Sequence, residues 1–404
     1  MKNNHQGNYE QQLTPLTLWV MTITTCLVVA NIYYNQPLLN DIAQDFKVST
    51  AKAGQVSMYT QMGYAAGLLF IVPLADMLQR KKLMLIDFAL IIASLLAIGF
   101  SKNIILLYAA SFLVGLSSVI PQLLIPMVAH LAKPSERGKK IGFVQSGLLI
   151  GILLSRTISG FAGAHFGWRS IFYIAAGLMV VLWFLVYRLL PEIEPSYHGK
   201  YGSLMKSLID IFKEEPKLRL AAFRGALCFA AFSAFWSTLI FLLRLPQFNE
   251  GSDVAGLFGL VGAFGAIAVG FMGRLSDKMD AYKLSTFTIL LLVISFIVFF
   301  FSGSSFIGLV IGVILMDMGV QATHISNQTI IFSLNPAARN RINTVYMVSY
   351  FVGGSLGTLV ATQLWGSYGW NGVCAIGTIL SVIVLIVQLL NHKNMTVSNK
   401  TVQQ

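Results

Sequence analysis

The 404-residue sequence has few charged residues, few cysteines and no nucleotide-binding loop, and each shortage excludes a class of protein. Only 11% of the residues are charged, 56% are hydrophobic and the mean hydropathy is +0.72, which excludes an ordinary soluble domain. The three cysteines fall in apolar runs and the six histidines are scattered, so we expect no disulfide framework and no metal site. Without a phosphate-binding glycine loop, ATP is not the expected fuel, and we expect no cofactor.

Long apolar runs are what the sequence has instead. A run of about 20 apolar residues in a helix crosses the hydrocarbon core of a bilayer, and the helix satisfies its own backbone hydrogen bonds there. The sequence therefore predicts an all-α membrane protein. The twelve predicted spans lie near residues 15–37, 54–75, 83–101, 104–131, 141–163, 170–190, 219–243, 254–273, 284–303, 306–333, 342–365 and 370–391.

The placement of basic residues predicts the orientation in the cell membrane. Most of the 28 Lys and Arg fall in segments on the side of the two termini. Only Lys47, Lys52, Lys102, Arg169 and Arg244 fall on the other side. The positive-inside rule therefore predicts a multi-pass protein of the bacterial inner membrane with both termini in the cytoplasm. The net charge of +12 is explained by this orientation, and no nucleic-acid partner is expected.

One long polar stretch divides the spans into two groups of six. We expect a cytoplasmic tail at 1–14 without a cleavable signal peptide, a first bundle at 15–190, a central cytoplasmic loop at 191–218, a second bundle at 219–391 and a tail at 392–404.

The two bundles also resemble each other at an offset of about 202 residues. The offset pairs GWRSIF at 167–172 with GWNGVC at 369–374, Arg137 with Arg339, Gly151 with Gly353, and, at nearly the same spacing, Asp76 with Asp277. Such duplication is typical of transporters, whose substrate site lies between the repeats near the middle of the membrane.

The loop after the second span carries a recognisable motif, Val72-Pro-Leu-Ala-Asp76-Met-Leu-Gln-Arg80-Lys81. It resembles the G-x-L-x-D-R-x-G-R-R signature of the major facilitator superfamily, although both glycines are replaced. The segments NIYYNQPLL and GILLSRTISG resemble the bacterial efflux permeases of that superfamily. The resemblance implies the major facilitator fold, with twelve helices in two pseudo-symmetric halves.

The segment MDMGVQATHISNQ at 316–328 places polar residues inside an apolar span. Asp317, Gln321, His324 and Asn327 with Gln328 recur at helical spacing and share one stripe. An intramembrane Asp is costly and faces the bundle interior or water. We predict that Asp317 and His324 couple transport to protons and that Gln321 and Asn327 line a cavity. The alternative is that the stripe makes structural hydrogen bonds only.

Two arginines also lie within predicted spans. Arg156, in the fifth span, could bind an anionic group, pair with Asp317 or hydrogen-bond a carbonyl. Arg224 lies one turn into the seventh span, and we expect its side chain to reach back to the membrane surface. Asp87 is expected to be a boundary charge beside the basic loop.

The resemblance implies that spans 1, 4, 7 and 10 line a central cavity. Asn31, Tyr34, Gln122 and Trp236 then become cavity residues beside the stripe, together with Arg156. Tyr33 could equally belong to an aromatic belt at the membrane interface.

The cytoplasmic loops predict a gate, which the resemblance favours. A salt bridge between Arg80 and Glu136, or Asp76 at the N-terminus of the eleventh span, would hold this side shut. The predicted gate residues are Asp76, Arg80, Lys81, Glu136, Arg137, Asp277 and Arg339.

The expected function is secondary active transport by alternating access. Proton-coupled efflux of small organic molecules by an antiporter is the first choice, and uptake or facilitated transport of a small organic anion is the alternative. The expected partners are a small-molecule substrate, protons and the lipid bilayer, with the chain acting as a monomer. We expect no enzyme, because no nucleophile, base and metal set converges, and no sensor, because no soluble domain is appended.

Overall fold

A computed structural model of the chain describes residues 13–391 apart from 196, 198, 263–280 and 336–337. The described residues of the first half form α1 (Pro15–Ala30), η1 (Gln36–Leu38), α2 (Leu39–Asp45), α3 (Thr50–Phe70), η2 (Val72–Asp76), α4 (Arg80–Gly99), α5 (Ile104–Ser117), α6 (Ile120–Leu131), α7 (Arg137–Phe166) and α8 (Ser170–Leu189). Those of the second half form α10 (Pro216–Trp236), α11 (Leu239–Leu243), a helix at Ser252–Gly262, α13 (Ala281–Phe301), α14 (Phe306–Phe332) and α15 (Arg339–Leu390). Between the halves lies α9 (Tyr201–Glu214).

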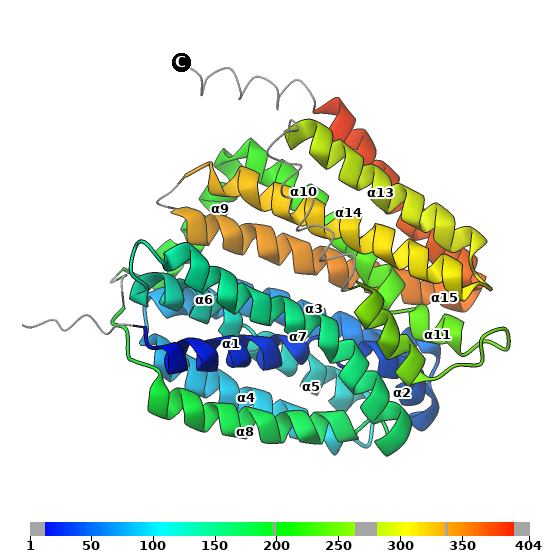
Figure 1. Cartoon of the computed structure of the whole chain (residues 1–404), viewed down its shortest axis with the longest axis horizontal. Helices are drawn as coiled ribbons and strands as arrows, with labels where there is room; N and C mark the ends of the chain where they lie inside the picture. Colours follow the sequence, from blue (N-terminus) through cyan, green and yellow to red (C-terminus); the bar gives the residue numbers. More distant parts are fainter. Residues whose placement is uncertain (1–12, 196, 198, 263–280, 336–337, 392–404) are drawn as a thin grey trace, which may run out of the picture.

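The long helices lie roughly side by side in two groups, α1–α8 in the lower part of Figure 1 and α10–α15 in the upper part. Nine helical segments of the described chain are long and apolar enough to cross a membrane, with α5 and α6 taken together as Ile104–Leu131. The longest, α15, supplies two of the predicted spans, because it breaks at Gly369. Gly369 adopts φ 59°, a left-handed value that glycine adopts without the steric cost of a Cβ. We retain 15–190 and 219–391 as the predicted bounds of the halves.

Local sequence signals explain where several helices begin or break. The Thr14 hydroxyl accepts a hydrogen bond from the Thr17 backbone N–H at 3.1 Å, so it caps the N-terminus of α1. Asn103 caps α5 in the same way. Pro121 lacks a backbone N–H and lies where the fourth span breaks into α5 and α6.

Glycines place the helices of each half close together, in matching positions. A Cβ on Gly151 of α7 would lie 2.1 Å from the Cys26 carbonyl oxygen of α1, and a Cβ on Gly353 of α15 would lie 2.2 Å from that of Ala226 in α10. Gly151 and Gly353 are the pair related by the 202-residue offset. The internal repeat seen in the sequence is therefore a repeat of helix packing, in which small residues let backbones touch.

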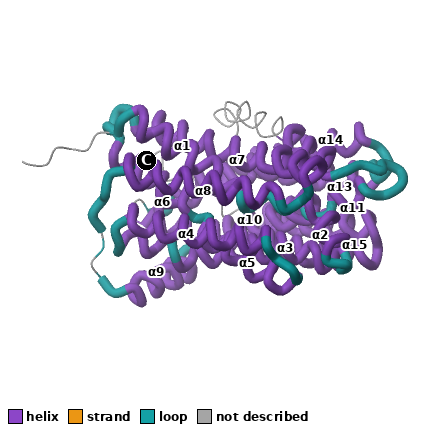
Figure 2. Tube along the Cα trace, turned by 90° about the horizontal axis from the view of Figure 1, so that it is seen from below, coloured by secondary structure: helices purple, strands orange, loops and turns teal. Residues whose placement is uncertain are grey.

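The two ends of the bundle differ. One end, which we call the α9 side, holds α9 and the start of α1, and the other, the α2 side, holds α2 and α11 (Figures 1 and 2). The Tyr201 hydroxyl, at the start of α9, donates to the Phe70 carbonyl of α3 at 3.0 Å. Leu204 and Leu208 are the residues of α9 that are buried. The central loop is thus a helix packed on the bundle rather than a free tether.

Candidate functional site

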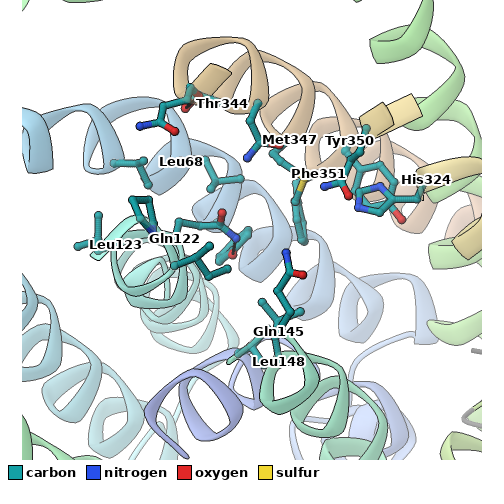
Figure 3. Close-up of a pocket in the computed structure, with 18 of the residues that line it drawn as sticks. Leu68, Gln122, Leu123, Gln145, Leu148, His324, Thr344, Met347, Tyr350 and Phe351 are labelled. Carbon is teal, nitrogen blue, oxygen red and sulfur yellow. Dashed lines mark hydrogen bonds between the residues drawn. The ribbon is translucent and has the colours of Figure 1, made fainter. Parts of the chain in front are cut away.

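A cavity of 440 Å³ lies between the two halves. Its size is within the usual range of small-molecule sites. Figure 3 shows residues of both halves around it, with Gln122 and Gln145 from the first half and His324, Tyr350 and Phe351 from the second. Towards the α9 side the lining includes Asp76, Arg80, Leu204, Leu208, Arg339 and Arg341, so the cavity extends to the helix ends there.

On the α2 side the halves are in direct contact. The Thr157 hydroxyl of α7 donates to the Gly256 carbonyl at 2.9 Å, and the Ser252 hydroxyl donates to the Gly160 carbonyl at 3.1 Å. A Cβ on Gly256 would lie 2.6 Å from the Arg156 carbonyl oxygen, so this approach requires glycine. The cavity is therefore closed towards the α2 side.

A salt bridge also joins the halves at this end. The Arg244 guanidinium lies 3.0 Å from the Asp41 carboxylate. Among the described residues, the other three salt bridges lie within the first half. Burial raises the pKa of the Asp41 carboxyl above its ordinary value of 3.8, although Arg244 acts in the opposite direction.

The polar stripe of α14 divides between the cavity and the protein interior. Gln321, His324 and Gln328 line the cavity, whereas Asp317 is 2% exposed and Asn327 is buried behind the wall. The His324 Nδ1 lies 2.9 Å from the Tyr346 hydroxyl oxygen. This contact fixes the orientation of the His324 imidazole, and His324 is itself one of the residues that line the cavity.

The Arg156 guanidinium is enclosed by aromatic rings. It lies 4.2 Å from the Trp236 ring centroid and 4.8 Å from that of Tyr33, and its Nε donates to the Gln36 side-chain oxygen at 2.7 Å. Aromatic faces stabilise a cation without neutralising it. Arg156 does not line the cavity, while Tyr33, which covers it, does.

Arg156 on α7 and Asp317 on α14 do not form a salt bridge. In the described part of the chain, the Nη2 of Arg156 and the Oδ2 of Asp317 are both buried without a hydrogen-bond partner. The Ser252–Gly262 helix contacts both side chains. A Cβ on Gly259 would lie 3.1 Å from the Arg156 Cβ, and one on Gly262 would lie 3.2 Å from the Asp317 Oδ2. Two opposite charges are thus buried on opposite halves, each without an acid–base partner in direct contact.

With this geometry, comparisons with known proteins identify the family. The model of the Major Facilitator Superfamily matches residues 21–358 and 257–401. The chain belongs to the major facilitator superfamily. It is 40% identical to the uncharacterized transporter YgaY of Escherichia coli O157:H7, over 96% of both chains. It is 22% identical to a probable sugar efflux transporter of Helicobacter pylori, over 93% of this chain and 95% of the relative.

Solved structures of this superfamily share the fold. The nucleoside transporter NupG matches with a TM-score of 0.75 at 15% identity, over 93% of this chain and 99% of that one. A bacterial homolog of the human lysosomal transporter Spinster, in an inward-facing and unoccupied conformation, matches with a TM-score of 0.68 at 14% identity, over 96% and 98%. The predicted all-α major facilitator fold is confirmed, and with it the classification as a membrane transporter.

Arg224 corrects one expectation for this major facilitator protein. It is 1% exposed and does not reach the membrane surface. Its Nη1 donates to the Gln388 side-chain oxygen and its Nη2 to that of Asn327 at 2.6 Å. Because Arg224 lies near a helix end, we expected a solvated side chain. Instead, the side-chain amides of Asn327 in α14 and Gln388 in α15 bind it inside the second half. Asp87 is also buried, at 3% exposed, rather than a boundary charge.

The cavity residues predicted from spans 1, 4 and 7 are placed in different ways. Gln122 lines the cavity and donates to the Tyr64 hydroxyl at 3.3 Å. Asn31 and Tyr34 are buried outside the lining, with the Asn31 amide 3.7 Å from the Met179 sulfur. Trp236 covers Arg156 instead. For these three residues a role in transport stays a prediction.

Three of the predicted gate residues, Asp76, Arg80 and Arg339, line the cavity at its α9 end. The Arg80 guanidinium is 3.5 Å from the Asp76 carboxylate, and the Glu136 carboxylate is 4.0 Å from the Lys140 ammonium, so Arg80 and Glu136 are not paired with each other here. The Lys81 ammonium lies 5.6 Å from the Tyr187 ring centroid, and Arg137 lies at the start of α7. The Arg339 Nε donates a hydrogen bond to the Phe332 carbonyl. Asp277, the last predicted gate residue, lies outside the described residues. A gate would form when this end closes, so the pairing stays a prediction.

Two cavity residues were missed in the sequence, Gln145 and Tyr64. Tyr33, for which an interfacial belt was left open as an alternative, lines the cavity as well. The 202-residue offset pairs Gln145 with Met347, and both line the cavity. The same offset pairs Gln122 with His324.

Proposed function

We propose that this protein is a proton-coupled secondary transporter that exports small organic molecules by alternating access. The observation that carries the proposal is the cavity between the halves, closed at the α2 side and extending to the α9 side. A substrate site near the middle of the membrane, reached from one side at a time, is the requirement of this mechanism. In this proposal the α9 side is cytoplasmic, as the positive-inside rule predicts.

The buried charges support proton coupling. Asp317 is enclosed without a salt bridge to any described residue and lies on the same helix as six residues of the cavity wall. An intramembrane carboxylate marks a proton relay by default. Arg156, on the other half, supplies the counter-charge when Asp317 ionises. His324 is the second proton site in this proposal, because its imidazole lines the cavity and also contacts the Tyr346 hydroxyl.

Export is supported by the relatives named sugar efflux transporters and by the open cytoplasmic end, from which a substrate would load. Uptake of an organic anion was the alternative, with Arg156 as the anion-binding residue. Its guanidinium is covered by Tyr33 and Trp236 and lies outside the lining, so this state does not favour that role.

Reconstituted vesicles test the proposal. With a pH gradient imposed across the membrane, pools of cationic, neutral and anionic small molecules are presented and proton flux is recorded. We expect proton flux that depends on substrate and disappears in Asp317→Asn and His324→Gln. Asp210→Asn, a change in α9 outside the cavity, is the matched control and should leave flux unchanged. Substrate movement without proton movement would overturn the coupling and leave a facilitator.

A further inference from the structure

The cavity holds its charged side chains at one end only. Asp76, Arg80, Arg339 and Arg341 belong to the helix ends of the α9 side. Further in, the described lining contains no acid, lysine or arginine, and its polar residues are His324, Thr344, tyrosines and amides. A charged substrate would leave water there without a counter-charge in the wall, which is strongly unfavourable.

Four glutamines give polar character to the inner part of the cavity, which we call the chamber. Gln122 and Gln145 come from α6 and α7 of the first half, and Gln321 and Gln328 come from α14 of the second. Each amide offers two hydrogen-bond donors and one carbonyl acceptor. A ligand bound between them is therefore recognised by both halves at once.

Three of these amides have no hydrogen-bond partner among the described residues. Within the described residues, the side chains of Gln145, Gln321 and Gln328 make no hydrogen bond, and Gln122 makes one, to Tyr64. A purely apolar ligand would cover these amides and leave them unpaired, at a cost of about 1–3 kcal/mol each. The chamber therefore favours a ligand that brings its own donors and acceptors.

Aromatic rings form part of the wall beside the amides. Tyr350 and Phe351 line the cavity, as Figure 3 shows, and Phe229 stacks on Tyr350 with 4.1 Å between ring centroids. Flat ring faces accept the C–H face of a ligand whose edges carry polar groups. Amides and ring faces together fit a compact ligand with hydroxyl edges and an apolar face.

We infer that the chamber binds uncharged polyhydroxylated molecules and recognises them through hydrogen bonds from Gln122, Gln145, Gln321 and Gln328. This inference rests on the proposed function, because it names the substrate class of the same cavity. Hydroxyl groups both donate and accept, as the amides do. Saccharides and nucleosides share this chemistry. Arg156 takes no part in binding, since its charge is covered by Tyr33 and Trp236.

Ligand-induced thermal stabilisation of the purified full chain tests the substrate class. The probes are lactose, uridine, citrate and tetraphenylphosphonium, which represent a neutral saccharide, a neutral nucleoside, an anion and a cation. We expect lactose or uridine to raise the unfolding midpoint in a saturable way, because binding to the folded state alone stabilises it. A response to one of the two identifies the source of the hydroxyl groups. Stabilisation by citrate or tetraphenylphosphonium alone would overturn the inference.

Substitutions test the glutamines. Gln145→Leu and Gln321→Leu keep a helix-forming side chain of similar size and remove the amide, so each should weaken binding of the responding probe about tenfold. Gln321→Glu should weaken it as well and introduce binding of tetraphenylphosphonium. Gln363→Leu, an exposed glutamine of α15 outside the cavity lining, is the matched control and should have no effect. An equal loss in Gln363→Leu would overturn the assignment.

Vesicle transport separates the two proposals. Proton-coupled movement of tetraphenylphosphonium or citrate, with no response to lactose or uridine, would leave the transporter intact and overturn the substrate class. Glutamine-dependent binding of lactose or uridine, with no movement of the bound probe across the vesicle membrane, would support the binding site and overturn the proposed transport.

Discussion

Arg156 and Asp317 are opposite charges buried on opposite halves, each 2% exposed, with no salt bridge between them. Gly259 of the Ser252–Gly262 helix lies against the arginine, and Gly262 lies against the aspartate. Any motion that opens the α2 side must move this helix relative to α7, because Gly256 contacts α7 directly. If the halves separate at this side, as we propose, the distance between the two charges changes with that motion.

A double-mutant cycle tests whether these charges interact. Arg156→Gln or Asp317→Asn alone removes one charge and leaves the other buried without an opposite charge, so each should lower the melting temperature of the purified protein. The double variant removes both and should be more stable than the sum of the single effects predicts. We expect a coupling energy of about 1 kcal/mol, measured from thermal unfolding in detergent.

Asp210→Asn combined with Arg156→Gln is the control cycle. Asp210 lies on α9, away from the aromatic rings around Arg156, so its effect should simply add to that of Arg156→Gln. Additive effects in the Arg156 and Asp317 cycle as well would show that the two charges act independently.

Much of the fold follows from the sequence because the bilayer imposes a simple rule. Each span must be helical and apolar, so hydropathy locates it, and the duplication fixes which helices correspond. The offset pairs Gly151 with Gly353, and these two glycines make matching helix contacts. It also pairs Gln122 with His324, and both line the cavity. Periodicity alone placed Gln321 and His324 on one stripe of α14, and both line the cavity.

The side-chain environments could not be predicted in the same way. Arg224 is bound by Gln388, which is 164 residues away in the chain, and Arg156 is covered by rings from two different halves. Such contacts depend on how the helices are rotated about their axes, which hydropathy does not specify. Position within a span therefore gave the depth of each charge but not its partner.

Charge reversal tests the closed end. Arg244→Glu places like charges beside each other at Asp41 and should open the α2 side. The partly exposed pair contributes at most about 1 kcal/mol, so we expect a severalfold rise in opening. The measurement is the rate at which a cysteine introduced by Ser252→Cys, at a buried position, reacts with a membrane-impermeant reagent in a variant without the native cysteines. The swap Asp41→Arg with Arg244→Asp should restore the slow rate.

A second salt bridge on the same side is the matched control. The Arg169 guanidinium lies 2.7 Å from the Asp45 carboxylate, but both residues belong to the first half. Arg169→Glu should therefore leave the labelling rate unchanged. A rise equal to that of Arg244→Glu would assign the effect to surface charge rather than to contact between the halves.

Closure of the α2 side should also depend on pH. Burial raises the pKa of Asp41 in the closed state, whereas a solvated carboxyl in the open state keeps its ordinary value. Closure therefore binds a proton. It is favoured at low pH and weakens as the pH rises above about 4, through the raised pKa. Labelling at Ser252→Cys should rise with pH more steeply than in the same chain carrying Asp41→Asn. This comparison cancels the pH dependence of the thiol, and identical slopes would contradict the prediction.

The close approach at Gly256 should control the same equilibrium by packing alone. A Cβ there would meet the Arg156 carbonyl oxygen at 2.6 Å and the Thr157 Cα at 3.1 Å, and these backbone atoms cannot rotate away. Gly256→Ala should therefore destabilise the closed α2 side by about 1–3 kcal/mol and speed labelling at Ser252→Cys by about tenfold or more. Gly177→Ala is the matched control, because no atom lies within 4 Å of a Cβ at Gly177. Unchanged labelling in Gly256→Ala, or an equal rise in Gly177→Ala, would show that this contact does not hold the α2 side closed.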